Sequence, residues 1–167
     1  MKYAAIVMIV LAAAALALGI YTYANARLVV TSISMESLPA FERQEDFAAL
    51  QTAVDQGALM GTPYADEVPG SSLDYNFLTF TFRLKNNGLI GAEMVEIQPL
   101  PVNGDVLSYT TLDPERVNES LNVGSRQERD TWCVVLASAQ SDAQTSRSFR
   151  ITYYLWGSPR TMTVNYN

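Results

Sequence analysis

The sequence contains no histidine and only one cysteine, Cys133, in 167 residues. Without histidine the chain cannot build Ser-His or Cys-His nucleophiles, and it lacks the commonest protein ligand of zinc, copper and haem iron. A single cysteine cannot close an internal disulfide, which excludes a small secreted scaffold held together by such bonds. The sequence also has no glycine-rich nucleotide loop. We therefore expect no catalytic residue, no metal site and no cofactor.

Basic residues are also scarce. The chain has 11 Lys and Arg residues against 17 Asp and Glu residues, for a net charge of -6, and the basic residues are scattered. Proteins that bind nucleic acid usually carry a clustered basic face, because neutralising phosphate charge dominates their affinity. The composition therefore argues against a nucleic-acid partner, and an acidic domain has no general attraction to an anionic membrane surface.

One long hydrophobic run stands out, from Tyr3 to Tyr23, with no charged residue inside it. As a helix it would span about 30 Å, which matches the hydrocarbon core of a bilayer. Tyr21 and Tyr23 lie at its outer end, where aromatic rings favour the membrane interface. We interpret residues 1–26 as a single-pass signal anchor in the cell membrane, followed by an extracytoplasmic domain over residues 27–167.

A cleavable signal peptide is the alternative, with Ala24-Asn25-Ala26 as the cleavage site. The apolar stretch from Ala4 to Ile20 is longer than the ~7–15 residues usual for such a peptide, which favours the anchor. The positive-inside rule decides little, because Lys2 precedes the helix while Arg27 and Arg43 come after it. We expect the N-terminus inside, because leaders of this kind normally export the domain behind them. Both interpretations export the domain.

The rest of the chain shows mainly the period of two that is typical of strands. The clearest case is 75–86, in which Leu78, Phe80, Phe82 and Leu84 share one face. Further strands are expected at 27–38, 92–100, 130–138, 148–156 and 160–166, and after the Asn103-Gly104 hairpin signal. About seven strands without βαβ alternation predict a mainly β fold, an antiparallel immunoglobulin-like β-sandwich.

Two segments carry more specific expectations. Over 41–59, Phe47, Leu50 and Val54 follow helical spacing, which predicts one amphipathic helix, inserted after the first strand, that covers one end or edge of the sheet. Within 27–38, strict alternation would place Val29, Thr31, Ile33 and Met35 on one face, opposite Leu28, Val30, Ser32 and Ser34.

Three features of the sequence match one known kind of domain. They are the stretch FTFRLKNNGLIGAEMVEI, Gly124 before a strand, and the closing YYLWGSP hairpin. Over residues 75–167 the chain resembles small bacterial ectodomains of immunoglobulin-like fold that follow an N-terminal anchor. Such domains are mostly uncharacterised. The resemblance implies the fold and the anchored topology, and it implies no catalytic residues. The predicted helix at 41–59 departs from the plain sandwich pattern.

The candidate contact residues are Tyr154 and Trp156, which point away from the predicted core face. Exposed Tyr and Trp side chains often anchor protein partners or sugars. The alternative is that the early helix covers this second sheet face. Asn118 begins an N-glycosylation tripeptide that we do not expect to be used.

The remaining polar candidates are interpreted structurally. Cys133 lies among apolar neighbours and is expected to be a buried thiol. Glu93 and Glu96 have odd spacing, which would place them on opposite strand faces and prevent an acid-base pair. Asp66, Glu67 and Asp74 match no calcium loop and are interpreted as solvated acids.

These observations favour a non-enzymatic interaction or accessory module with a protein partner in the cell envelope. One alternative is a pilin-like subunit of a surface filament, although the chain has no prepilin-type leader and no Glu inside its apolar helix. Another is a carbohydrate-binding module that uses Tyr154 and Trp156. An enzyme acting through carboxylates alone would need two acids ~5–10 Å apart, a distance that the sequence does not give.

Overall fold

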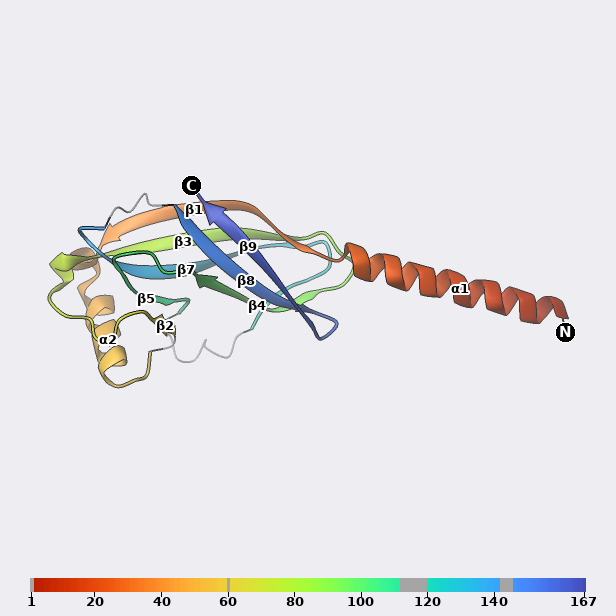
Figure 1. Cartoon of the computed structure of the whole chain (residues 1–167), viewed down its shortest axis with the longest axis horizontal. Coiled ribbons are helices and arrows are strands. Elements are labelled where there is room, and N and C mark those ends of the chain that lie inside the picture. Colours follow the sequence, from red (N-terminus) through yellow and green to blue (C-terminus); the bar gives the residue numbers. More distant parts are fainter. Residues whose placement is uncertain (1, 60, 112–119, 142–145) are drawn as a thin grey trace.

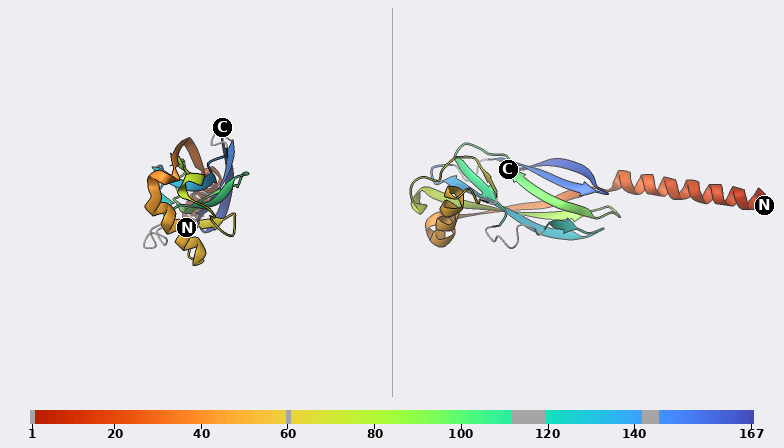
Figure 2. Two further views of the ribbon diagram at one scale, coloured as in Figure 1. Left: turned by 90° about the vertical axis from the view of Figure 1, so that its left-hand side faces the viewer. Right: turned by 90° about the horizontal axis from the view of Figure 1, so that it is seen from below.

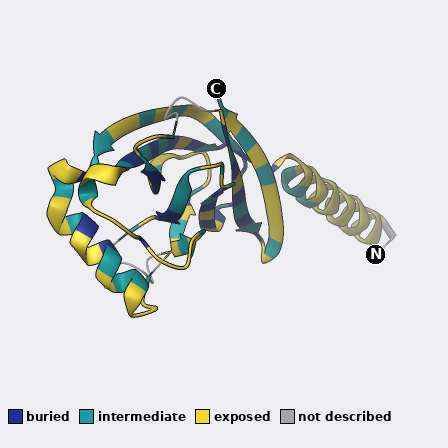
Figure 3. Cartoon of the chain, turned by 60° about the vertical axis from the view of Figure 1, so that its left-hand side comes forward, coloured by how far each residue is buried: buried dark blue, intermediate teal, exposed yellow. Residues whose placement is uncertain are grey.

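The computed structural model describes residues 2–59, 61–111, 120–141 and 146–167 (Figure 1). Helix α1 (Lys2–Asn25) projects from one end of a β-sandwich, and its axis continues the long axis of the sandwich (Figure 1). The helix is apolar and its surface is exposed all round, as a lipid-facing span would be (Figure 3). A signal sequence near the N-terminus has the same composition. Asn118 lies outside the described residues.

Two antiparallel sheets form the sandwich, which confirms the predicted fold class. The five-stranded sheet has the order β1-β3-β7-β5-β2, and the four-stranded sheet has the order β6-β4-β8-β9. The strands are β1 (Leu28–Pro39), β2 (Gly61–Pro63), β3 (Tyr75–Asn86), β4 (Ala92–Pro99), β5 (Asp105–Tyr109), β6 (Leu121–Val123), β7 (Glu128–Ser138), β8 (Arg147–Leu155) and β9 (Ser158–Tyr166). The sequence does not predict β2 and β6, because three residues are too few to show a period.

The main core lies between the two sheets. Leu78, Phe80, Phe82 and Leu84 of β3 are fully buried there, as their alternation predicted. Phe149 of β8 contacts both phenylalanines, with ring centroids 4.8 Å from each. Burying each of these rings stabilises the fold by about 1.5–3 kcal/mol.

A second core lies on the outer face of the five-stranded sheet, at the end far from α1. Helix α2 (Gln44–Asp55), preceded by a 3-10 turn at Ala40–Arg43, covers this region (Figures 1 and 2). Phe47 and Leu50 of α2 are buried in the same cluster as Phe77 of β3. The predicted covering role is confirmed, although α2 ends at Asp55, just before Gly57 adopts a φ of 63°.

A β-bulge in β1 makes the predicted faces of this strand wrong. The pairing with β3 shifts register between Val30 and Ser32. Leu28 and Val30 therefore lie on the same core-facing side as Ile33 and Met35. The extra residue of a bulge changes which face each later side chain occupies, so strict alternation fails across it.

A second bulge, at Met94 in β4, overturns the expectation for Glu93 and Glu96. Glu93 pairs with Tyr154 and Glu96 with Thr152, and the register shifts between these two pairs. Tyr154 and Thr152 are two residues apart on β8 and share its outer face, so both glutamates face outward on the same side. The odd spacing misleads because Met94, at φ 51°, is the extra residue.

The Asn103-Gly104 turn does not close a hairpin. Gly104 has the positive φ, 94°, that such a turn signal implies. However, β4 belongs to the four-stranded sheet, whereas β5 pairs with β7 in the five-stranded sheet. The turn therefore carries the chain from one layer of the sandwich to the other, and the predicted hairpin is wrong.

Candidate functional site

The outer face of the five-stranded sheet changes character along its length. Near α1, two cross-strand ion pairs lie on it: Lys85 with Glu128 at 2.9 Å and Arg83 with Asp130 at 2.8 Å. At the far end, the apolar side chains of β3 and β7 are buried under α2. Between these regions the face is open.

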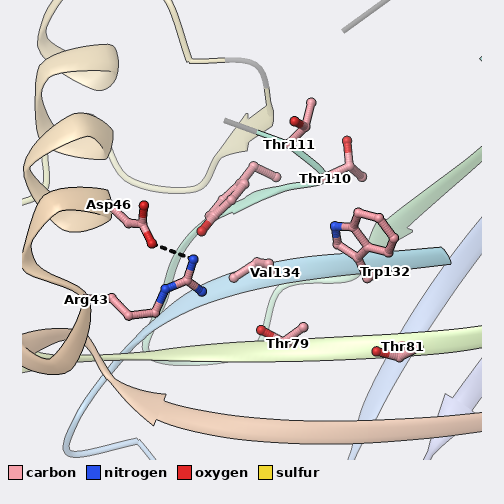
Figure 4. Close-up of a pocket in the computed structure, with 9 residues that line it drawn as sticks. Arg43, Asp46, Thr79, Thr81, Thr110, Thr111, Trp132 and Val134 are labelled. Carbon is pink, nitrogen blue, oxygen red and sulfur yellow. Dashed lines mark ion pairs between the residues drawn. The ribbon is translucent and has the colours of Figure 1, made fainter. Parts of the chain in front are cut away.

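A groove of about 440 Å³ occupies this open region, beside α2 (Figure 4). We call it the Trp132 groove. Its lining comes from the 3-10 turn, α2, β3, β7 and the end of β5. The lining residues are Arg43, Asp46, Thr79, Thr81, Tyr109, Thr110, Thr111, Trp132 and Val134.

Trp132 is the largest side chain that lines the groove. It pairs with Thr81 across β3 and β7, and 49% of it is exposed. The next residue, Cys133, faces the opposite side and is buried in the main core. Trp132 therefore stands on the outer face beyond the reach of α2, which covers Leu136 farther along β7.

Charged groups form one wall of the groove. Arg43 and Asp46 make an ion pair at 2.5 Å, and both side chains are more than one-third exposed (Figure 4). The Arg43 guanidinium also lies 5.4 Å from the centre of the Phe77 ring. These two contacts hold the guanidinium beside the groove, and its side chain stays partly exposed.

Tyr109 lines the inner part of the groove and is only 5% exposed. Its hydroxyl has no hydrogen-bond partner among the described residues. Burial raises the pKa of Tyr109 to about 12, so the hydroxyl stays protonated at neutral pH. A buried hydroxyl without a partner costs free energy.

Trp132, Tyr109 and the polar wall together line one open groove. Thr79, Thr81 and the Arg43–Asp46 pair place hydrogen-bond donors and acceptors around an exposed indole. Within the described parts of the chain, no group of three His, Cys, Asp or Glu residues is close enough to hold a metal ion. Burial raises the pKa of Cys133 to about 12, so its thiol is a poor nucleophile at neutral pH.

The two candidate residues from the sequence lie elsewhere. Trp156 is at the tip of the β8–β9 hairpin, and its ring stacks on Tyr23 of α1 with centroids 6.1 Å apart. Tyr154 is half-buried on the outer face of the four-stranded sheet, opposite Glu93. The alternative in which the early helix covers their face is wrong, because α2 packs on the other sheet.

The alternation of residues in the sequence does not show that Trp132 is exposed. In the stretch DTWCVVLAS, residues on both faces of β7 are apolar, because α2 buries the outer face over part of the strand. The pattern therefore resembles that of a strand buried throughout. The place of α2 and its 3-10 turn on the sheet leaves Val134 buried and Trp132 half-exposed, and the sequence of β7 alone does not show that place.

Comparisons of the chain with protein-family models and with curated proteins found no match.

Proposed function

We propose that this protein is a non-enzymatic, membrane-anchored interaction module of the cell envelope, which binds a protein partner through the Trp132 groove. The observation that carries the proposal is the half-exposed Trp132 in a groove of about 440 Å³. Partly buried Trp residues framed by polar groups dominate the energetics of many protein interfaces.

The groove suits a partner segment with one apolar side chain and several polar groups. The indole of Trp132 would contact the apolar side chain. Thr79, Thr81 and the Arg43–Asp46 pair would accept and donate hydrogen bonds around it. Because both signs of charge are already paired on the groove wall, a strongly charged partner gains little there.

Contacts between α1 and the sandwich support an anchor that is retained. Ala26 is only 7% exposed and belongs to the main core cluster, and Tyr23 packs against the same cluster. Cleavage after Ala26 would separate this residue from the strand that begins at Leu28 and would remove Tyr23 from Trp156.

Photo-crosslinking in intact cells tests the proposal. A crosslinking residue at Thr110 should capture a repeatable protein neighbour, and the matched residue at Thr152, on the outer face of the other sheet, should not. Adding Trp132→Ala should lower the Thr110 yield at least several-fold. Mass spectrometry of the purified chain should find the residues of α1 still attached. No neighbour at Thr110, or equal capture at both positions, would contradict the proposed interface.

A carbohydrate ligand is a second candidate for the same groove. The observation that favours it is an exposed indole face beside threonine hydroxyls and a fixed Arg-Asp pair, which can stack on a sugar ring and bind its hydroxyls. A glycan array probed with the chain and with Trp132→Ala distinguishes the two. If the native chain binds a glycan and Trp132→Ala does not, the result would support a carbohydrate ligand. If the native chain binds no glycan, the result would exclude one.

The filament alternative stays a prediction. An apolar helix exposed all round would suit packing between subunits as well as contact with lipid. Electron microscopy of cells with and without the protein decides between these roles, and identical cell surfaces would exclude a filament.

A further inference from the structure

Exposed apolar side chains gather at the end of the sandwich from which α1 leaves. Trp156 is 66% exposed and Leu89 is 53% exposed. Trp156 is in the turn between β8 and β9, and Leu89 is in the loop between β3 and β4. Neither residue belongs to the Trp132 groove, and neither side chain contributes much to packing in the protein interior.

Contacts with the α1–β1 junction place both loops beside the helix. Gly88 packs so closely on Ala26 that an added Cβ would lie 2.9 Å from the Cα of Ala26. The backbone N–H of Asn87 donates to the carbonyl of Arg27 at 3.3 Å. On the other side, Trp156 stacks on Tyr23. The two loops therefore flank the junction.

Exposed arginines accompany these apolar residues. Arg27 lies two residues after the end of α1. The backbone N–H of Arg126 donates to the carbonyl of Gly88 at 3.2 Å. The Arg160 guanidinium lies 5.1 Å from the centre of the Tyr23 ring. We call Leu89, Trp156 and these three arginines the collar.

We propose that the collar is a lipid-binding surface that sits in the headgroup region of the bilayer, with the Trp156 indole and the Leu89 side chain at the boundary of the acyl chains. The proposal rests on the retained anchor of the proposed function, because α1 fixes which end of the sandwich meets the membrane. The collar is not needed for anchoring itself, and it adds a second contact with the lipid.

The chemistry of the collar matches that of a membrane interface. Trp and Tyr are enriched at the headgroup level, because their rings are apolar with one polar edge. Tyr23 is near the end of the apolar span, and Trp156 stacks on it, so both rings lie at the same depth. Arginine side chains at this depth bind lipid phosphates while their stems cover apolar surface. The chain as a whole is acidic, but Arg27, Arg126 and Arg160 supply local positive charge at this end of the sandwich.

The chain has only two tryptophans, which makes the test direct. Trp132→Phe leaves Trp156 as the only indole, and Trp156→Phe leaves Trp132 as a matched control far from the collar. Both full-length variants are inserted into phosphatidylcholine vesicles, with and without a lipid that carries a quenching spin label near the headgroup. We expect the labelled lipid to quench Trp156 at least twofold and to leave Trp132 nearly unchanged.

A third variant tests the apolar contact. Leu89→Asp in the Trp132→Phe background should reduce the quenching of Trp156, because a charged side chain resists burial at the acyl boundary. Flotation of the vesicles distinguishes a failure of the collar from a failure of the anchor. If the chain floats with the vesicles but Trp156 is not quenched, the collar is wrong while the anchor stands. If the chain does not float, the anchor itself is wrong.

Discussion

Arg147 and Asp105 form an ion pair inside the sandwich, where charged side chains are rare. Their side chains are 1% and 0% exposed, and the Nη1 and Oδ2 atoms are 2.6 Å apart. Arg147 begins β8 of one sheet and Asp105 begins β5 of the other, so the pair joins the two layers. The backbone N–H of Val102 also donates to Oδ2 at 2.9 Å.

Substituting one partner of this pair should destabilise the protein strongly. Arg147→Met leaves the Asp105 carboxylate buried without its cation, which should lower the free energy of unfolding by about 3–5 kcal/mol. Adding Asp105→Asn removes the stranded charge and should recover much of this loss. Urea unfolding of the full chain in detergent, followed by fluorescence, measures both effects.

Arg83→Ala is the control for this prediction. It breaks an ion pair with the same chemistry, but that pair lies exposed on the sheet surface and is screened by water. Its loss should be much smaller than that of Arg147→Met. Equal losses would mean that the buried pair contributes no more than a surface pair.

Cys133 and Tyr109 make stability depend on pH in the alkaline range. Burial raises both folded-state pKa values to about 12, from usual values of 9.0 for Cys133 and 10.0 for Tyr109. The unfolded chain therefore loses these protons at lower pH than the folded chain. Their stabilisation is complete below pH 9 and is lost as the pH rises toward 12.

The expected result is a free energy of unfolding that falls between pH 9 and pH 11, by at most about 1.4 kcal/mol per pH unit for each group. Cys133→Ala should reduce this slope, most clearly between pH 9 and pH 10, where the thiol of the unfolded chain loses its proton before the Tyr109 hydroxyl does. Urea unfolding at several pH values measures the slopes. Identical slopes for the two proteins would contradict a buried, neutral thiol.

At the scale of the elements, the bulge at Met94 sets the register of the four-stranded sheet. Its φ of 51° is unusual for a residue other than glycine. The Met94 side chain is 60% exposed, so it contributes little packing, whereas its backbone N–H donates to Asn122 Oδ1 at 3.0 Å. The backbone conformation, rather than the side chain, is what the site requires.

The stability of variants at Met94 should depend on how well the new residue tolerates a positive φ. Met94→Val places a β-branched residue in the left-handed region and should lower the free energy of unfolding by about 1–2 kcal/mol. Met94→Asn is the matched control, because Asn tolerates this conformation, and it should leave stability nearly unchanged. Thermal melts of the three proteins compare them, and an equal loss in both variants would contradict the bulge.

Local patterns predict those elements whose environment is uniform along their length. β3 is buried on its inner face from Leu78 to Leu84, so its period of two gave the correct core residues. The bulges in β1 and β4 depend on pairing with a neighbouring strand, which no single-strand pattern records. The exposure of Trp132 likewise depends on where α2 lies across the sheet, and Trp156 contacts a helix residue far away in sequence.

At the scale of the whole molecule, α1 and the sandwich are joined without a flexible linker. Ala26 and Leu28 are buried in the main core, on either side of the exposed Arg27. The long strands run away from the junction, and α2 lies at the opposite end of the sandwich (Figure 1). If α1 spans the bilayer, the sandwich stands upright and presents the Trp132 groove well away from the lipid.

Energy transfer to dyes in the lipid headgroups tests this upright orientation. We expect strong transfer from a donor on Asn87→Cys, beside the junction, and weak transfer from a donor on Gln56→Cys, at the end of α2. The two donor positions lie near opposite ends of β3, whose twelve residues span about 40 Å. Cys133→Ala in both proteins removes the native thiol. Equal transfer from the two positions would mean that the sandwich lies on its side, which would bring a face of the sheets, rather than the collar alone, against the bilayer.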